Sequence, residues 1–145
     1  MVTFLLFTSK FLKGTKRTRE EFIPYLIDII EDQENEDDFL ILLCDEIVKL
    51  KDYIGGKEHL NKLLGPLEII GCMEETTVRQ RAVDNLIKLS KEDTESFCKN
   101  CLFLTIKKFA AWNNYMNKVS AASLLPICYP HVSEEQQKEL LNVFI

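Results

Sequence analysis

The sequence predicts an all-α protein with the architecture of an α-α superhelix, in which two-helix units stack side by side. Glycine and proline, the residues least favourable inside helices, number only five and four among 145 residues. Apolar residues recur at the spacing of one helix face, and this pattern returns about every 40 residues. With 46% apolar and 28% charged residues, the composition is that of a folded soluble protein rather than a disordered one.

The second helix of each predicted unit carries an apolar stripe with the spacing i, i+4, i+8. The stripe occurs three times, as Leu40, Cys44, Val48, then Val78, Ala82, Leu86, then Asn117, Ala121, Leu125. Its central residue is small in every copy, and successive central residues are 38 and 39 positions apart. Small residues let helices approach closely, so we expect this helix to pack against its equivalents in the neighbouring units.

The first helix of each predicted unit has its own recurring feature, a proline within apolar helical sequence. Pro24 and Pro66 lie 42 positions apart, and Leu104 takes the equivalent place 38 positions later. Because proline inside a helix breaks or bends it, a bend is expected at the same place in successive units.

Boundary signals complete a prediction of eight helices. Thr18 and Ser133 begin capping-box patterns, and Gly55-Gly56 is a helix stop. The expected helices are 2–13, 18–31, 37–54, 57–72, 74–90, 95–109, 115–129 and 133–145. They form three whole repeats (18–54, 57–90 and 95–129) and two half units (1–13 and 133–145), all in one array covering 1–145. Two-helix units of this length are typical of HEAT repeats.

The two predicted half units are rich in apolar residues, such as Phe4 and Phe144, that have no partner helix in the sequence. Solenoids normally end in polar capping repeats. We therefore expect a partial array, cut from a longer one, that can self-associate through its exposed helix ends.

Charge and cysteine content limit the classes of partner. The net charge of −5 argues against nucleic acid or an anionic membrane as partner. The apolar run from Met1 to Phe7 is too short to span a bilayer. Five cysteines, an odd number spread among apolar residues, are typical of reduced thiols in a protein of the cytoplasm or nucleus.

No catalytic, cofactor-binding or metal-binding residue is predicted. His59 and His131 lack a nucleophile or acid at a suitable spacing, and no glycine-rich phosphate loop is present. Cys98 and Cys101 form a C-x-x-C, but a zinc site would need two more ligands at suitable spacing. The acidic run 31–38 has six carboxylates but lacks the central glycine of a calcium loop, which favours a solvated turn or docking surface. The sequence thus predicts a protein that is not an enzyme.

Several segments, in order along nearly the whole chain, resemble the scaffold (A) subunit of protein serine/threonine phosphatase 2A. They are Arg17–Leu26, Gly55–Glu58, Leu63–Glu68, Glu74–Arg79 with Ala82 and Val83, and Cys128–Pro130 with Val132. The resemblance implies a non-catalytic scaffold whose intra-repeat turns bind a regulatory B-type subunit. It also implies that the phosphatase catalytic subunit binds only through repeats absent from this chain.

The resemblance further implies two contact features, the acid pair Glu74 and Glu75 and the tryptophan Trp112. Two departures bear on which partner binds: Ala111 stands where the family usually has an acid, and the first turn is longer and more acidic.

Repeat geometry places the acidic turn (Asp37, Asp38), the acid pair and Trp112 at equivalent positions, so we expect them to line one ridge. Arg79, from the same segment as the acid pair, completes the predicted partner-binding set. The sequence leaves two alternative functions open. One is a HEAT-repeat adaptor of another complex, such as a transport receptor or chromosome-associated subunit, and the other is an enzyme using Cys98 and Cys101 or the acidic loop.

Overall fold

The computed structural model describes residues 15–32, 36–112 and 114–144. Its α-helices are α2 (Thr15–Arg17), α3 (Ile23–Glu31), α4 (Asp37–Lys49), α5 (Leu64–Ile70), α6 (Thr76–Ser90), α7 (Thr94–Phe97), α8 (Phe103–Ala111), α9 (Tyr115–Cys128) and α10 (Glu134–Asn142). Two π-helical segments, η1 (Thr18–Phe22) and η4 (Cys98–Leu102), and three 3₁₀ segments, η2 (Leu50–Tyr53), η3 (Lys57–Leu63) and η5 (Tyr129–His131), join them. The described residues contain no strand, so the all-α prediction is confirmed.

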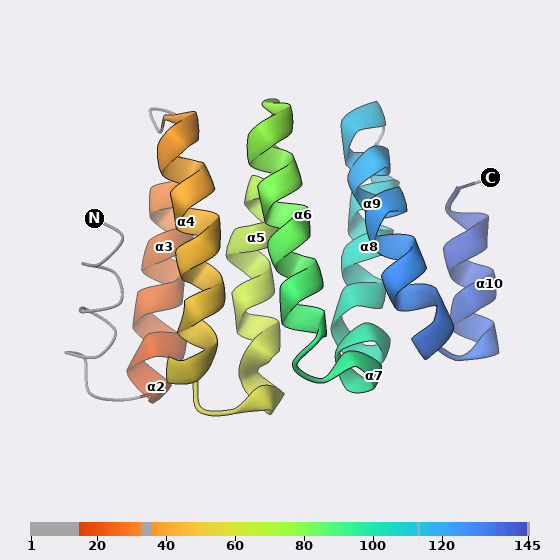
Figure 1. Cartoon of the computed structure of the whole chain (residues 1–145), viewed down its shortest axis with the longest axis horizontal. Coiled ribbons are helices and arrows are strands. Elements are labelled where there is room, and N and C mark those ends of the chain that lie inside the picture. Colours follow the sequence, from red (N-terminus) through yellow and green to blue (C-terminus); the bar gives the residue numbers. More distant parts are fainter. Residues whose placement is uncertain (1–14, 33–35, 113, 145) are drawn as a thin grey trace.

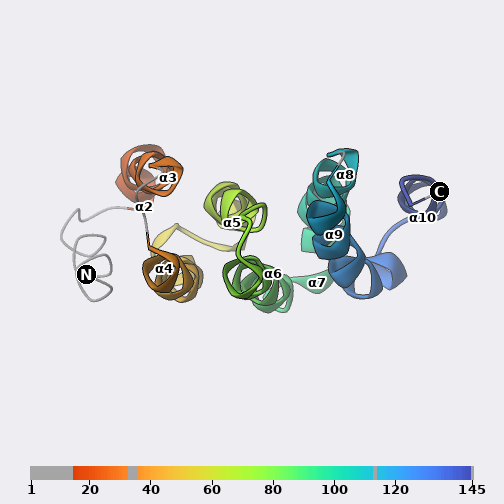
Figure 2. The same cartoon turned by 90° about the horizontal axis from the view of Figure 1, so that it is seen from above.

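The helices are arranged as antiparallel pairs that stand side by side in a row (Figure 1). We call the pair α3 and α4 the first unit, α5 and α6 the second, and α8 and α9 the third. Seen from above, α3, α5 and α8 lie in one layer, and α4 and α6 lie in the other (Figure 2). Along the row α4 packs on α6, and α6 packs on α9, while α10 packs on α8. This is the α-α superhelix of HEAT-type repeats that the periodicity predicts.

The small central residues of the apolar stripes make this stacking possible. Cys44, Ala82 and Ala121 are each 0% exposed, in α4, α6 and α9 respectively. These helices pack on one another in the order α4, α6, α9, and small buried side chains let helices approach closely.

The prolines lie where the helices of the first layer change their winding, and the bend at these places stays a prediction. Pro24 lies in the first turn of α3 and Pro66 in the first turn of α5, directly after η1 and η3. Proline lacks the backbone N–H that a continuous α-helix would use at this place. The third unit changes from the π-helical η4 to α8 at the same place, although it has Leu104 there. The change of helix type is thus a property of the repeat rather than of proline alone.

Most predicted boundaries agree with the structure, and one does not. Gly55 and Gly56 have φ of 95° and 122°, which makes them the helix stop that we predicted. Ser133 forms a capping box with Gln136 at the start of α10. Thr18, by contrast, lies inside a helical run from Thr15 to Glu31 and is not an N-cap. The predicted helix 2–13 and the residue 145 lie outside the described residues, and the division into repeats stays a prediction.

Polar contacts between units recur at the repeat interval. Asp45 of α4 accepts hydrogen bonds from Arg81 Nη1 at 2.7 Å and Asn85 Nδ2 at 3.1 Å, 36 and 40 residues further on. Glu68 of α5 accepts from Thr105 Oγ1 at 2.7 Å and Lys108 Nζ at 3.2 Å, 37 and 40 residues further on. Each carboxylate therefore ties one unit to the next, which keeps the turns of successive units in register.

Candidate protein-binding ridge

The turns inside the three units lie along one edge of the molecule, at the top of Figure 1, and the links between units lie along the opposite edge. The first turn joins α3 to α4, the second joins α5 to α6, and the third joins α8 to α9. We use the word ridge for the exposed residues Asp37, Asp38, Glu74, Glu75 and Trp112 on these turns and the adjoining helix ends. The structure thus brings five of the six predicted site residues to one edge.

An open groove of about 780 Å³ separates the first two turns. Its lining combines five carboxylates with four apolar side chains: Glu31, Asp32, Asp37, Glu74 and Glu75, then Ile30, Leu40, Ile69 and Met73. Among the described residues, no lysine, arginine or histidine lines it. The acidic groove, as we call it, therefore has an apolar floor and a strongly negative rim. Asp38 is exposed but lies outside it.

Arg79 lies beneath the second turn, and only 8% of it is exposed. Its Nη1 donates to the backbone oxygens of Met73 at 2.9 Å and Glu74 at 3.0 Å. The guanidinium also contacts Thr76 Oγ1 at 3.4 Å and, across the unit boundary, Met116 Sδ at 3.3 Å. Its donors are directed into the turn itself. Arg79 therefore supports the ridge from below, and its predicted contact with a partner stays a prediction.

Glu75 caps the N-terminus of α6. Its carboxylate accepts from Thr77 Oγ1 at 2.8 Å and from the Thr77 backbone N–H at 3.4 Å. These hydrogen bonds, with a smaller contribution from the nearby Arg79 charge, lower the pKa of Glu75 below its ordinary value. The residue thus stays ionised while it fixes the end of the second turn.

The third turn carries aromatic rather than acidic side chains. Trp112 directly follows α8 and is 62% exposed, as its place between two helices predicts. Asn114 caps α9 by accepting from the backbone N–H of Met116 at 2.8 Å. This cap places Tyr115, which is 81% exposed, at the first position of α9. Sequence reasoning missed Tyr115, although its place outside the buried stripe of that helix could have indicated it.

The apolar floor of the acidic groove is another feature that the sequence did not reveal. Ile69 and Met73 come from the end of α5 and the turn after it, and Leu40 comes from α4. Only the packing of the first unit against the second places them under the carboxylates. Glu31 and Asp32 belong to the acidic run that we interpreted as a docking surface, and the structure places both at the groove.

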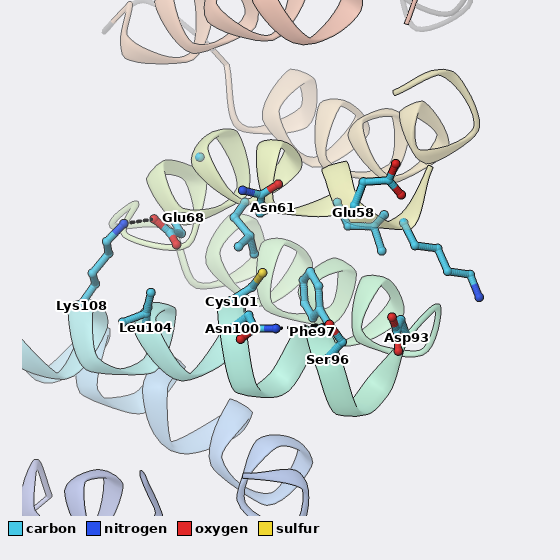
Figure 3. A pocket seen from close by; sticks show the side chains of 14 residues that line it. Glu58, Asn61, Glu68, Asp93, Ser96, Phe97, Asn100, Cys101, Leu104 and Lys108 are labelled. Carbon is cyan, nitrogen blue, oxygen red and sulfur yellow. Dashed lines mark hydrogen bonds and ion pairs between the residues drawn. The ribbon is translucent and has the colours of Figure 1, made fainter. Parts of the chain in front are cut away.

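A second hollow, of about 560 Å³, lies between α5 and the helical run from α7 to α8 (Figure 3). Phe97, Cys101 and Leu104 line it on one side, and Asn61 and Glu58 on the other. The ion pair between Glu68 and Lys108 closes the end where both helices approach the ridge. Its lining mixes both charges with amides and apolar groups, so it lacks the single sign of charge that distinguishes the acidic groove.

The residues that could carry chemistry are dispersed. His59 Nε2 lies 3.9 Å from Glu58, and His131 lies on the exposed η5. Within the described ranges, no three side chains of His, Cys, Asp or Glu gather where they could hold a metal ion. Burial raises the pKa of the Cys44 thiol to about 12, and it also raises those of Cys72 and Cys101. No helix in the described part of the chain has the length and apolarity needed to cross a membrane.

The stacked helix pairs and the edge of aligned turns define the class of protein, a HEAT-type solenoid with a candidate protein-binding ridge. No family model matches the chain. Among curated proteins it is 39% identical over 133 residues to the protein phosphatase 2A scaffold subunit of Dictyostelium discoideum. It is 33% identical over 131 residues to the beta isoform of the 65 kDa regulatory (A) subunit of serine/threonine-protein phosphatase 2A of Homo sapiens.

A third relative, a probable serine/threonine-protein phosphatase PP2A regulatory subunit of Caenorhabditis elegans, is 32% identical over 131 residues. Each match covers 90% of this chain but only 21–22% of the relative, so the chain spans about a fifth of their length. The predicted resemblance to phosphatase 2A scaffold subunits is confirmed.

Proposed function

We propose that this chain is a non-catalytic scaffold component of a phosphatase 2A-type complex and that its ridge binds a regulatory B-type subunit. The observation that carries the proposal is the acidic groove, which the aligned first and second turns form beside the exposed tryptophan of the third. The names of the similar proteins, which are scaffold and regulatory subunits, support the scaffold role. They also favour it over an adaptor of a transport or chromosome-associated complex.

The acidic groove fits lysine and arginine side chains of a partner. Their aliphatic stems can cover apolar surface such as Ile69 and Met73, while their charged ends meet the carboxylates on the rim. Charge complementarity of this kind accelerates encounter and selects the partner more than it adds affinity. The groove therefore specifies a partner surface that is basic opposite the first two turns.

Trp112 and Tyr115 fit a different part of the same partner. Exposed tryptophan and tyrosine combine a large apolar area with few rotatable bonds, and they are enriched among residues that dominate binding energy. The partner surface opposite the third turn is then apolar or offers a pocket. A basic and an apolar region in this order fix both the position and the direction of the partner along the ridge.

The phosphatase catalytic subunit has no assigned place on this chain. The resemblance assigns its binding to repeats that the chain does not contain, so we propose that contact with it is indirect, through those repeats.

The proposal is tested by introducing three substitutions, Asp37→Arg, Glu74→Arg and Trp112→Ala, and measuring the affinity of the chain for a B-type regulatory subunit. Glu75 is left in place because it caps α6. We expect the dissociation constant to rise at least about 30-fold, since a single dominant interface residue contributes about 2 kcal/mol or more.

The matched control carries Asp52→Arg and Glu58→Arg, exposed residues of η2 and η3 on the opposite edge. It makes the same change in net charge but should bind within about twofold of the unmodified chain, as expected for sites outside an interface. Circular dichroism confirms that both variants are folded. If the ridge variant binds as tightly as the control, the proposal is wrong.

A further inference from the structure

Two buried thiols meet at the end of the third unit that lies away from the ridge. Cys98 is the first residue of η4 and Cys128 the last residue of α9, and each is 0% exposed. Cys128 Sγ lies 3.5 Å from the backbone oxygen of Cys98, and Cys98 Sγ lies 3.8 Å from the backbone oxygen of Ile127. Both are free thiols.

Cys101 is the alternative partner that the C-x-x-C pattern indicates, but the geometry disfavours it. Residues three apart on a helix have Cβ atoms about 5–6 Å apart, whereas a disulfide needs about 3.5–4.5 Å. Cys101 also faces the hollow between α5 and α8, where Figure 3 shows its sulfur. Cys98 instead packs toward α9.

We propose that Cys98 and Cys128 are a redox-modification site, at which a hydroperoxide joins them in a disulfide that ties the two helices of the third unit together. In the first step the Cys98 thiolate attacks one peroxide oxygen; the O–O bond breaks, a Cys98 sulfenic acid forms and hydroxide leaves. In the second, the Cys128 sulfur attacks the sulfenic sulfur, the S–S bond forms, and the hydroxyl leaves as water with the Cys128 proton. Two thiols and one hydrogen peroxide thus give one disulfide and two waters.

The environment of the pair decides which sulfur reacts first. The neighbouring Cys128 thiol lowers the pKa of Cys98, while the interaction with Cys98 together with burial raises the pKa of Cys128. Cys98 is therefore the nucleophile. A small hydroperoxide suits this site better than a peptide disulfide does, because both sulfurs are buried.

The disulfide would close a loop of 30 residues at the end of the unit opposite Trp112. A crosslink of this length restricts the unfolded chain, so we expect the oxidised protein to melt roughly 5–10 °C higher. The ridge itself stays accessible, and the effect is to stiffen the third unit.

The test is to treat the whole folded chain with hydrogen peroxide, block the remaining thiols with iodoacetamide, and map its peptides by mass spectrometry without reduction. We expect the Cys98 and Cys128 peptides to be linked, with a mass two hydrogens below their sum, and dithiothreitol to release them. Cys101→Ser should leave the link intact, as the matched control, and Cys128→Ser should abolish it.

Three results would overturn the proposal: a link between Cys98 and Cys101, conversion of Cys98 to sulfinic or sulfonic acid alone, or a Cys98–Cys128 link that forms only in denaturant. The map of the unmodified chain decides among these results, so the test does not depend on the folding of any variant.

Discussion

A buried guanidinium organises the second turn of the ridge. Arg79 binds two backbone oxygens of that turn and reaches Met116 in the next unit, so one side chain couples the turn to the neighbouring helix. Sequence reasoning marked Arg79 because of its neighbours but assigned it to the partner. The direction in which a charged side chain points depends on what packs above it, and here the turn itself folds over the guanidinium.

Replacing this residue tests its supporting role. We expect Arg79→Ala to lower the free energy of unfolding by about 2–4 kcal/mol, because the carbonyl oxygens of Met73 and Glu74 lose a charged donor. Lys118→Ala, 39 residues further on and exposed, is the matched control and should change it by less than about 0.5 kcal/mol. Urea denaturation measures the free energy of unfolding of both variants. If both substitutions lower it equally little, Arg79 does not support the turn.

The ionisation of Glu75 depends on Thr77. We expect Thr77→Val to raise the pKa of Glu75 toward its ordinary value, since the largest cause of its lowering is removed. A carboxyl whose pKa is lowered by folding stabilises the protein above its ordinary pKa, and this stabilisation is lost as pH falls through the lowered value. Titration followed by NMR measures the shift. Glu95, whose pKa is lowered by Lys99, should not move; parallel shifts in both residues would point to a global change instead.

At the scale of the elements, the packing of Phe109 in α8 against the end of α5 depends on the absence of a side chain at Gly71. A Cβ built there would lie 2.9 Å from Phe109 Cζ and 3.2 Å from the backbone oxygen of Leu67. At Gly65 the nearest atom would be Ile27 Cδ1 at 3.4 Å, which is ordinary contact. The two glycines belong to the same helix or its end but meet different neighbours.

This difference gives a paired prediction. Gly71→Ala should destabilise the chain by about 1–3 kcal/mol through overpacking against Phe109. Gly65→Ala should be neutral or stabilise it by up to about 1 kcal/mol, because alanine is the better helix former. Thermal or urea unfolding measures the stability of both variants. A larger loss of stability for Gly65→Ala than for Gly71→Ala would contradict this packing.

The positions of the elements could be predicted better than their winding. Apolar stripes, the capping box at Ser133 and the Gly55-Gly56 stop are local signals, and they located the helices of all three units. The shift to π or 3₁₀ winding before each first-layer α-helix is not local, since it also occurs in the third unit, which lacks the proline. Thr18 has the residues of a capping box yet lies within a helix, because the residues before it from Thr15 on are already helical.

For the molecule as a whole, the repeat spacing explains why the ridge could be anticipated. Units that repeat at a constant interval place equivalent turns on one edge, so the acidic turns and Trp112 could be aligned from their positions alone. The acidic groove could not be anticipated in this way, because Leu40 and Met73 become its floor only when two units pack against each other. Tyr115 differs from the groove, since its place outside the buried stripe of α9 could have indicated its exposure.

The concentration of carboxylates on this edge predicts salt-dependent binding. We expect the association rate constant for a B-type subunit to fall severalfold between about 50 mM and about 300 mM salt, as screening shortens the reach of the acidic groove. The pair Asp37→Arg and Glu74→Arg should flatten this dependence, whereas Asp52→Arg and Glu58→Arg should not. Stopped-flow kinetics measures the association rate constants. If the rate constant of the ridge variant depends on salt as strongly as that of the unmodified chain, the charges that attract the partner lie elsewhere.

A hydrogen-exchange footprint of the chain, with and without a B-type regulatory subunit, tests most directly whether the ridge binds that subunit. We expect slower exchange in the second and third turns, at 73–77 and 112–116, and in the start of α4 at 37–40. We expect no change in the links between units on the opposite edge, at 50–58 and 91–94. Protection of those links with the ridge unchanged would contradict it.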